Sequence, residues 1–367
     1  LDPDAKNNPF MFRMDLLQND KVRYPNQPIA VVVADTFEAA TEGAALLAPQ
    51  YDTEAARTGL DSADSSAPQA VGAGAGATET HGDVDAGMAA ASVRMEATYD
   101  TPAQYHNAME PHAIVAAWDG DTLSIDTPSQ GMSMAVARIA GLFGIAPEGI
   151  HIRSPFLGGG FGSKGLLSGP QVLGIMAARL VGRPVKLVLT RPQNFTGLGH
   201  REDQTQTISL GATREGKLTA IVHEKTSTTS PFDNYAETNG EIMSWLYACD
   251  NYQTSYRLAK GNTMTPTYMR APGESPGSFA IECALDDLAY QLGLDPLEIR
   301  LRNYAEHDPE TGYAWSSKSL KECYERGAAL IGWNKRNPKN GITRDGKYLV
   351  GMGMGTGSYP VWSGQGT

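Results

Sequence analysis

The feature that most constrains the fold is a glycine-rich loop over residues 158–165, with the sequence Gly-Gly-Gly-Phe-Gly-Ser-Lys-Gly. A strand-like apolar run at 150–152 precedes it, and a helix-like run at 172–180 follows it. Consecutive glycines at such a junction indicate a backbone that approaches another group too closely to leave room for a Cβ atom. The loop is therefore either a tight strand-to-helix turn or a place where backbone amides contact a ligand.

One alternative for this loop is a dinucleotide-binding turn. Gly160, Gly162 and Gly165 satisfy the GxGxxG pattern of such turns. The acidic residue that would bind the ribose about 20 residues later is absent, because the next strand-like run leads into Arg191. A phosphate-binding P-loop needs a lysine directly after its closing glycine, and Ser163 occupies that place. An NADP-binding oxidoreductase that uses the three glycines and Arg191 stays open as an alternative.

Two other polar residues occupy junctions before helix-like runs. Arg270 lies in a turn rich in proline and glycine at 269–277, before a run whose helical N-terminus would attract an anion. Gln130 lies between a strand-like run and a helix-like run, and its amide can both donate and accept hydrogen bonds to a ligand. The alternative interpretations are an ion pair at a turn for Arg270 and an ordinary helix start for Gln130.

Charge and cysteine usage exclude several classes of function. The chain carries 41 acidic against 30 basic residues, a formal net charge of −11, which disfavours a nucleic-acid partner. No apolar run approaches the roughly 20 residues of a membrane span. The 3 cysteines are far apart, so no CxxC metal or iron–sulfur motif occurs. His106 and His112 lack the further ligands of a zinc site, and we predict structural roles for both.

Hydrophobic periodicity predicts an α+β fold in which hairpins mix with helices. A β-branched run at 28–34 predicts a strand, followed by a helix whose face from Phe37 to Leu47 would belong to the core. Residues 54–87 are poor in large apolar side chains and predict a linker. Beyond it, the pattern predicts strands or hairpins at 93–99, 114–125 and 208–222, and helices at 132–143, 172–180, 279–292 and from Pro296.

Five motifs stand in the order found in one enzyme family. They are Met109-Glu110-Pro111-His112, the segment around Gln130, the loop at 158–164, the turn at 269–274 and Asp295-Pro296-Leu297-Glu298-Ile299-Arg300-Leu301-Arg302-Asn303. From about Val22 onwards the chain therefore resembles the molybdenum-cofactor-binding large subunits of the xanthine dehydrogenase and aldehyde oxidase family. The resemblance is greatest to bacterial aldehyde oxidoreductases of the periplasmic type.

The resemblance implies a domain organisation. Residues 1–53 would be the C-terminal part of a hammerhead-like α/β domain, 54–87 a linker, and 88–367 the first molybdenum-cofactor-binding domain, of mixed α+β fold. The second cofactor domain, and with it the catalytic general-base glutamate of a Gly-Val-Gly-Glu motif, has no counterpart in these residues. We therefore expect the chain to be a fragment, or one chain, of a larger subunit.

The resemblance also implies a cofactor and the residues that contact it. The dithiolene of molybdopterin would bind the molybdenum, so no protein ligand to the metal is expected. Gln130 would hydrogen-bond the apical oxo ligand of the molybdenum. The residues that contact the cofactor would be Gly159, Gly160, Phe161, Gly162, Arg270 and Ala271. Bacterial relatives of this kind usually carry the cytosine dinucleotide form of the cofactor.

The implied activity is the oxidation of an aldehyde to a carboxylic acid with water as the oxygen source. Gly165, Ser244 and Pro272 stand where purine-oxidising relatives have a glutamate, an arginine and a phenylalanine, so an aldehyde is expected and not a purine. Electrons would leave through 2Fe-2S centres and FAD on partner subunits. The location is either the periplasm or the cytoplasm; the resemblance favours the periplasm, and no signal segment is visible in these residues. A non-catalytic scaffold of the same fold is the remaining alternative.

Overall fold

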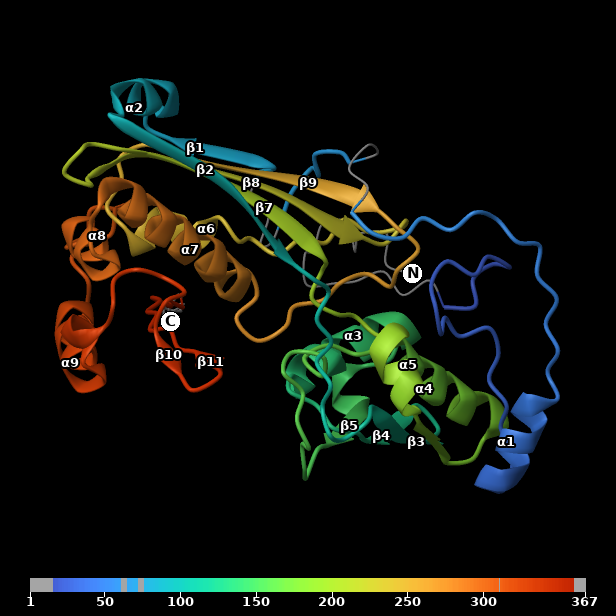
Figure 1. Ribbon diagram of the computed structural model, residues 1–367. Coiled ribbons are helices and arrows are strands. Elements are labelled where there is room, and N and C mark those ends of the chain that lie inside the picture. Colours follow the sequence, from blue (N-terminus) through green and yellow to red (C-terminus); the bar gives the residue numbers. More distant parts are fainter. Residues whose placement is uncertain (1–15, 61–64, 72–75, 310, 360–367) are drawn as a thin grey trace.

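Two larger β-sheets with helices packed against them organise the computed structural model (Figure 1), which describes residues 16–60, 65–71, 76–309 and 311–359. Among these residues, the first sheet has the spatial order β1 (Thr78–His81), β9 (Tyr252–Lys260), β8 (Leu218–Thr229), β7 (Gln204–Ala212) and β2 (Val93–Thr101). The second sheet has the order β5 (Ile150–Arg153), β4 (Thr122–Asp126), β3 (Ala113–Asp119) and β6 (Val185–Val188). Both sheets mix parallel and antiparallel neighbours, which confirms the predicted α+β fold.

Helices cover both faces of the first sheet. On one face lies α2 (Val84–Ala90), and on the other α7 (Glu274–Leu292) packs on β2 and β7, with α6 (Glu241–Leu246) and α8 (Pro296–Arg302) beside it. The core between α7 and the sheet consists of fully buried aliphatic side chains, including Ile208, Leu210, Ile281, Leu285 and Leu288. Each such side chain stabilises the fold by about 1.5–3 kcal/mol. This core fixes α7, and with it the turn at its N-terminus.

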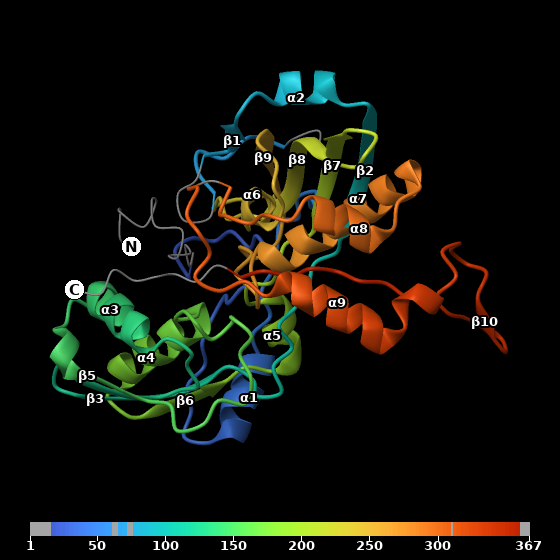
Figure 2. The same cartoon turned by 90° about the vertical axis from the view of Figure 1, so that its left-hand side faces the viewer.

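The second sheet carries its helices on one face (Figure 2). Here α4 (Gly169–Val181) packs on β3 and β6, and α3 (Met132–Phe143) lies beside β5. A capping box of Ser168 and Gln171 starts α4, and a left-handed glycine ends each helix. Gly120, at φ +59°, lies in the tight turn between β3 and β4. The hairpin and the two helices predicted for this region are therefore confirmed.

The remaining α-helices and strands of the described residues lie outside the two cores. They are α1 (Phe37–Ala45), α5 (Arg191–Thr196), α9 (Leu320–Ile331) and the short hairpin of β10 (Arg344–Asp345) and β11 (Tyr348–Leu349). Within the described residues, no helix combines the length and the apolar character needed to span a membrane.

The prediction of a strand at 28–34 is wrong. These residues are unpaired, and Ile29, Val31 and Val33 are exposed. The helix after them forms, with Thr36 accepting from the Ala39 amide as its N-cap, but none of its residues is buried and Phe37 is 78% exposed. A strand needs a neighbouring strand for hydrogen bonds, and no described strand pairs with 28–34. An amphipathic helix needs an apolar surface to cover its apolar face, and the described residues do not bury that face of α1. Residues 1–15 of the hammerhead-like domain predicted for 1–53 lie outside the described residues.

The segment predicted as a linker contributes to the first sheet. Residues 78–81 of it form β1, α2 begins inside it at Val84 and continues to Ala90, and Ser66 forms a bridge with Leu258 on β9. Small side chains suit these places, because adding a Cβ to Gly87 would bring it within 2.4 Å of the Thr219 carbonyl oxygen. Residues 61–64 and 72–75 of the segment lie outside the described residues. The boundaries of the predicted domains stay predictions.

The last motif of the sequence builds a buried ion centre. Arg300 is fully buried, and its guanidinium donates to Glu282 at 2.8 Å and to Asp286 at 2.7 Å. Glu282 also accepts from the Thr356 amide at 2.7 Å, so the centre joins α7 and α8 to the C-terminal segment. The helix α8 begins at Pro296, as predicted, and Asp295 caps it by accepting from the Leu297 amide at 2.8 Å.

Buried histidines predict a loss of stability in acid. Burial, with His106 as a lesser contributor, lowers the pKa of His200 to about 4, and burial together with Lys225 lowers that of His223 to about 3. The unfolded chain protonates both near pH 6.5, so between these values it binds more protons than the folded chain, and stability falls as the pH falls. We expect each histidine to reduce the unfolding free energy by roughly 1–2 kcal/mol between pH 7 and pH 5.

Urea unfolding at both pH values measures this effect. The double variant His200→Gln/His223→Gln should lose part of the pH dependence, and the comparison separates the histidines from buried carboxylates that titrate in both proteins. Equal pH dependence of the wild type and the double variant would contradict the assignment.

Candidate functional site

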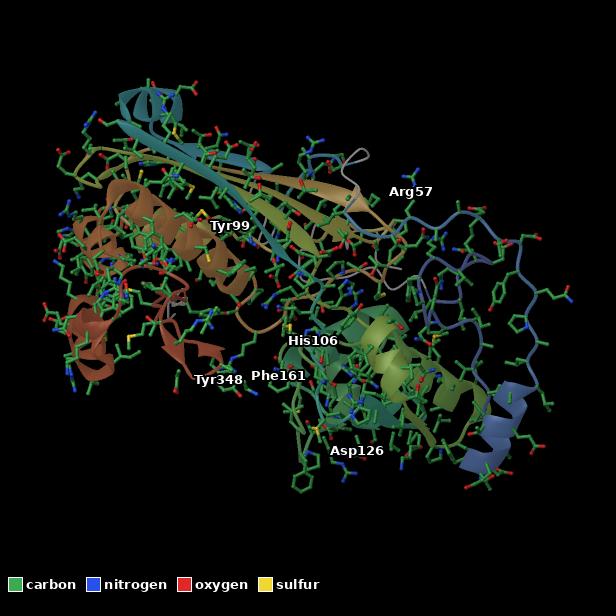
Figure 3. All side chains as sticks on the ribbon, viewed as in Figure 1. Arg57, Tyr99, His106, Asp126, Phe161 and Tyr348 are labelled. Atoms are coloured by element: carbon green, nitrogen blue, oxygen red, sulfur yellow. The ribbon has the colours of Figure 1, made fainter. Side chains whose placement is uncertain are left out.

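A cavity of about 630 Å³ lies where the glycine loop meets the turn before α7. The lining residues are Gln130, Gly160, Phe161, Gly162, Tyr268, Met269, Arg270, Ala271, Pro272 and Tyr359. They come from segments far apart in sequence: the start of α3, the loop between β5 and α4, the turn before α7, and Tyr359. Figure 3 shows Phe161 on the side of the smaller sheet that is turned toward the larger one. Every predicted cofactor-contacting residue except Gly159 lines this cavity.

The glycines of the loop are required by close approach to other parts of the protein. A Cβ on Gly160 would lie 2.3 Å from Gln130 Oε1, and a Cβ on Gly162 would lie 2.4 Å from the Tyr268 carbonyl oxygen. Gly162 also has φ +109°, a conformation that L-residues rarely adopt. Phe161 between them has φ +55°, which is strained for a residue with a side chain. The predicted close approach of this backbone is therefore found.

Gln130 presents a hydrogen-bond donor to the cavity. Its Oε1 accepts from the backbone amides of Gly162 at 3.0 Å and Lys164 at 3.3 Å, and the backbone amide of Gln130 donates to the Lys164 carbonyl at 2.8 Å. These bonds fix which end of the side-chain amide faces the loop. No described group accepts from Nε2, which is left to donate to a ligand in the cavity.

Glu110 and Lys164 close the glycine loop at its two ends. Lys164 Nζ is buried and donates to Glu110 Oε2 at 2.8 Å, and the Gly158 amide donates to the same oxygen at 2.8 Å. Burial acts to raise the pKa of Glu110, but the hydrogen bonds from Lys164 and Gly158 outweigh it and lower the pKa overall. The sequence motif at 109–112 contains Glu110 but does not by itself predict this contact. The sequence feature that could have indicated the pair is a carboxylate in one motif, Glu110, and a lysine in the glycine loop that follows, Lys164.

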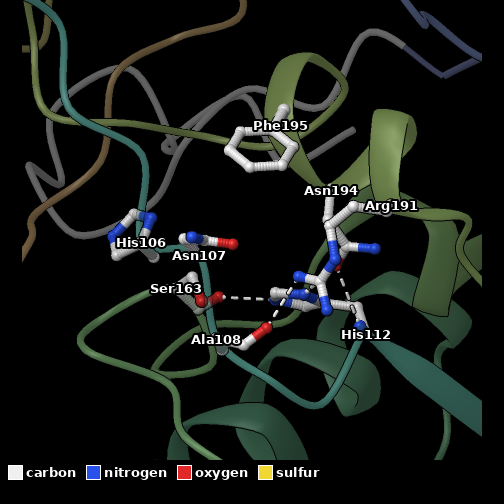
Figure 4. A pocket seen from close by; sticks show the side chains of 8 residues that line it. All are labelled: His106, Asn107, Ala108, His112, Ser163, Arg191, Asn194 and Phe195. Carbon is white, nitrogen blue, oxygen red and sulfur yellow. Dashed lines mark hydrogen bonds between the residues drawn. The ribbon is translucent and has the colours of Figure 1, made fainter.

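A second cavity, of about 10 Å³, lies behind the loop (Figure 4) and has room for about one water molecule. His112 bridges two segments there, with Nδ1 at 3.0 Å from Asn194 Oδ1 and Nε2 at 3.0 Å from the Ser163 carbonyl. His106 Nε2 lies 3.1 Å from the Tyr268 carbonyl oxygen. Burial lowers the pKa of both histidines. Both therefore hold the backbone around the loop, in the structural role predicted for them.

The turn before α7 brings a cation to the larger cavity. The Arg270 amide donates to the Phe161 carbonyl at 2.9 Å, which joins this turn to the glycine loop. The Arg270 side chain is exposed, and no described carboxylate is paired with its guanidinium. Ala271 has φ +55° and Gly273 has φ +88°. Because α7 begins at Glu274, the positive end of a 19-residue helix also lies beside the cavity.

The geometry does not favour the dinucleotide-binding alternative. In that turn the glycines open the helix itself, whereas α4 begins at Gly169, after Gly165 and a separate cap at Ser168. The Gly162 amide is already bound by Gln130. Arg191 donates to the carbonyls of residues 108 and 109 at 2.7 and 2.8 Å, so it is not free for a ribose phosphate.

Gly165, Ser244 and Pro272, which stand where purine-oxidising relatives have other side chains, differ in their distance from the cavity. Pro272 lines the cavity, and a Cβ on Gly165 would meet the Tyr268 hydroxyl at 3.1 Å. Ser244 is buried in α6, where its hydroxyl donates to the Glu241 carbonyl at 2.9 Å, and it does not line the cavity. Ser244 therefore contributes no side chain to the wall of this cavity.

Comparison with curated proteins finds relatives of one kind. Over 345 residues the chain is 39% identical to the aldehyde oxidoreductase molybdenum-binding subunit PaoC of Escherichia coli (strain K12), covering 93% of this chain and 46% of PaoC. It is 29% identical over 350 residues to the putative xanthine dehydrogenase molybdenum-binding subunit XdhA of the same organism, covering 92% of this chain and 46% of XdhA. The chain spans about half the length of these curated relatives.

Solved structures share the fold. Quinoline 2-oxidoreductase from Pseudomonas putida 86 superposes with a TM-score of 0.71 at 22% identity, covering 82% of this chain and 41% of that one. The aldehyde oxidoreductase from Desulfovibrio gigas superposes with a TM-score of 0.61 at 24% identity, covering 71% of this chain and 30% of that one.

The match to a protein family covers the segments that build the cavity. Residues 66–304 match the family described as molybdopterin cofactor-binding domain, a range that contains Gln130, the glycine loop and the turn at 269–273. This range is more than half of the chain, and the relatives above are molybdenum-binding subunits of oxidoreductases. The chain therefore belongs to the molybdopterin-binding family of the xanthine dehydrogenases and aldehyde oxidoreductases.

Proposed function

We propose that this chain forms part of the large subunit of a molybdenum hydroxylase that oxidises aldehydes to carboxylic acids with water as the oxygen source. The observation that carries the proposal is the cavity of about 630 Å³, where an unpaired amide donor, a cation and glycine backbone face one space. Ligand cavities for organic molecules commonly have volumes of roughly 300–1,000 Å³.

The residues around the cavity fit a large anionic cofactor. Arg270 and the N-terminus of α7 attract negative charge, such as the phosphate and dithiolene groups of molybdopterin. Gln130 Nε2 would donate to an oxo ligand, while Gly159, Gly160, Phe161, Gly162 and Ala271 would pack against the cofactor. When bound, the molybdenum cofactor supplies the two-electron oxidation and the path for oxygen from water. The residues of this chain hold and orient it.

We further infer the composition of the complete enzyme. The cofactor would be the cytosine dinucleotide form of molybdopterin, and 2Fe-2S centres and FAD would be carried by partner subunits. The rest of the large subunit would supply the general-base glutamate. The relative PaoC is named as a molybdenum-binding subunit, which supports a multisubunit enzyme. The resemblance to periplasmic-type enzymes supports a periplasmic location.

Aldehyde is favoured over purine as the substrate. PaoC, which shares 39% identity, is named as part of an aldehyde oxidoreductase. Phe161, Met269, Pro272 and Tyr359 give the cavity an aromatic and apolar wall, and Gly165 supplies no carboxylate beside it. A purine presents polar ring edges, and leaving such groups unpaired in a buried site costs about 1–3 kcal/mol each.

The proposal is tested on the intact complex by elemental analysis and by kcat/KM for benzaldehyde, a short aliphatic aldehyde, xanthine and hypoxanthine. We expect about one molybdenum per large subunit and at least a tenfold preference for the aldehydes, equivalent to about 1.4 kcal/mol in transition-state binding. Purines oxidised as well as both aldehydes would overturn the substrate assignment. NADP binding without molybdenum would favour the dinucleotide alternative. A complex with neither oxidase activity nor a bound cofactor would favour a non-catalytic scaffold.

A further inference from the structure

Beneath the turn that carries Arg270, one face of the first sheet is polar although it is buried. Along β7 and β8 this face passes from apolar residues at Ile208, Leu210 and Ile221 to a polar patch. The polar patch consists of Glu202, Gln204, Gln206, His223, Lys225, Ser227 and Thr229, each at most 2% exposed. Burial of charges is unfavourable unless they are paired and hydrogen-bonded, so the patch must be compensated by specific contacts.

Arg201, at the edge of this patch, holds the backbone of the turn. Its guanidinium nitrogen Nη2 donates to three consecutive carbonyls, those of Met269 at 3.0 Å, Arg270 at 2.8 Å and Ala271 at 3.2 Å. Its Nη1 donates to Gln104 Oε1 at 3.0 Å. The side chain is only 5% exposed, so these bonds form away from water.

Glu237 completes the contact from the other side of the turn. Arg201 Nε donates to Glu237 Oε2 at 3.1 Å, and the same oxygen accepts from the Gly273 amide at 3.0 Å. The backbone of Glu237 is itself anchored, because its amide donates to Glu202 Oε1 at 2.9 Å and its carbonyl accepts from Lys225 Nζ at 2.6 Å. Burial and the neighbouring Glu202 raise the pKa of Glu237, while Arg201 and Lys225 act in the opposite direction.

The turn needs such contacts because its backbone is strained. Ala271 has φ +55°, a conformation that persists only where surrounding contacts enforce it. Gly273 has φ +88°, and its Cβ position lies 2.9 Å from the Thr238 backbone. The Arg270 amide also donates to Phe161 in the glycine loop, so a displaced turn would disturb both walls of the cavity.

We propose that Arg201 and Glu237 are positioning residues that hold the turn at 269–273, and through it Arg270, against the cofactor. The hold on the turn follows from the contacts above, and its effect on the cofactor rests on the proposed function. Lysine cannot replace Arg201, because one ammonium group cannot reach Glu237, Gln104 and three carbonyls together, as the planar guanidinium does. The pair touches no lining atom of the cavity except through the turn's backbone.

The test compares Arg201→Lys and Glu237→Gln with Arg300→Lys in the intact complex. Arg300 is an equally buried arginine paired with Glu282, and it does not line the cavity, so it controls for the loss of a buried ion pair. Molybdenum retained after extended dialysis is measured by elemental analysis. Amide hydrogen exchange is followed in peptides covering 268–275, with peptides from β7 and β8 as references.

We expect both variants of the pair to retain roughly tenfold less molybdenum than wild type, the scale typical of lost outer contacts at a metal site. Exchange at 270–273 should accelerate while β7 and β8 stay protected. Arg300→Lys should lower the melting temperature without either change. Unchanged exchange at 270–273 in the folded variants, or an equal loss of molybdenum in Arg300→Lys, would overturn the proposal.

A milder variant tests the proposal even if Arg201→Lys and Glu237→Gln do not fold. Gln104 is exposed and contacts Arg201 Nη1, so Gln104→Ala loosens Arg201 without burying an unpaired charge. Faster exchange at 270–273 in this variant supports the proposal, and unchanged exchange contradicts it. If the complex holds no molybdenum, the proposed function fails, but the exchange measurement on the same complex still decides whether the pair holds the turn.

Discussion

Replacing Gln130 with glutamate should lower kcat of the intact enzyme by about 10²–10³-fold, the range for loss of one preorganised donor at a reacting group. The substitution is nearly isosteric. A carboxylate oxygen can still accept from the amides of Gly162 and Lys164, so the glycine loop keeps its contacts. What disappears is the Nε2 donor that faces the cavity. The measurement is kcat for benzaldehyde, normalised to the molybdenum content of each preparation.

Gln171→Glu is the matched control for this substitution. Gln171 is a buried glutamine whose Nε2 donates to Thr127 at 2.6 Å, and it lies on α4 outside the cavity. The same chemical change there should cost stability, because a donor is lost in the core, but should leave kcat per molybdenum unchanged. A Gln130 variant with full molybdenum and wild-type kcat would refute the assigned role.

The second large effect is expected for Gly162→Ala. The added methyl group would lie 2.4 Å from the Tyr268 carbonyl oxygen in a backbone with φ +109°. Both problems involve main-chain atoms, so no side chain can move aside to relieve them. We expect the unfolding free energy to fall by roughly 2–4 kcal/mol, and molybdenum content to fall below about a tenth of wild type, since outer contacts at metal sites are worth 10–100-fold in affinity.

Gly141→Ala is the control that shows whether the loss is specific to the crowded backbone at Gly162 or follows from any glycine-to-alanine change. Gly141 lies within α3, and a Cβ there meets no atom within 4 Å. Alanine at a helix-interior glycine should stabilise the protein by up to about 1 kcal/mol. Calorimetry and elemental analysis on both variants give the comparison. A Gly162 variant as stable and as rich in molybdenum as the Gly141 variant would disprove the close-approach argument.

Elements determined by nearby residues could be predicted from the sequence. The hairpin of β3 and β4, the helix α3 and the start of α8 all form where alternation or capping residues indicated them. In each case the deciding interactions span only a few positions, such as Asp295 accepting from the Leu297 amide. Periodicity and capping residues therefore contain enough information for these elements.

Long-range contacts of the site could not be predicted in this way. Motif order predicted six residues that line one cavity, yet it did not reveal that the loop glycines approach Gln130 and Tyr268. Arg201 contacts Glu237 and Arg270, which lie 36 and 69 positions later. No local pattern encodes such pairings, because they depend on how β7 and α7 pack. The unpaired segment at 28–34 illustrates the same limit, since a β-branched run predicts extended backbone but not a partner strand.

That unpaired segment matters for handling this chain by itself. Ile29, Val31 and Val33 are exposed on it, and no described strand pairs with its backbone. An unpaired β-branched segment of this kind can pair with the same segment of another copy, and such pairing is a common route to aggregation. Concentrating the 367-residue chain alone would therefore favour turbidity over crystals. Light scattering during purification would reveal this before any enzymatic assay could be misread.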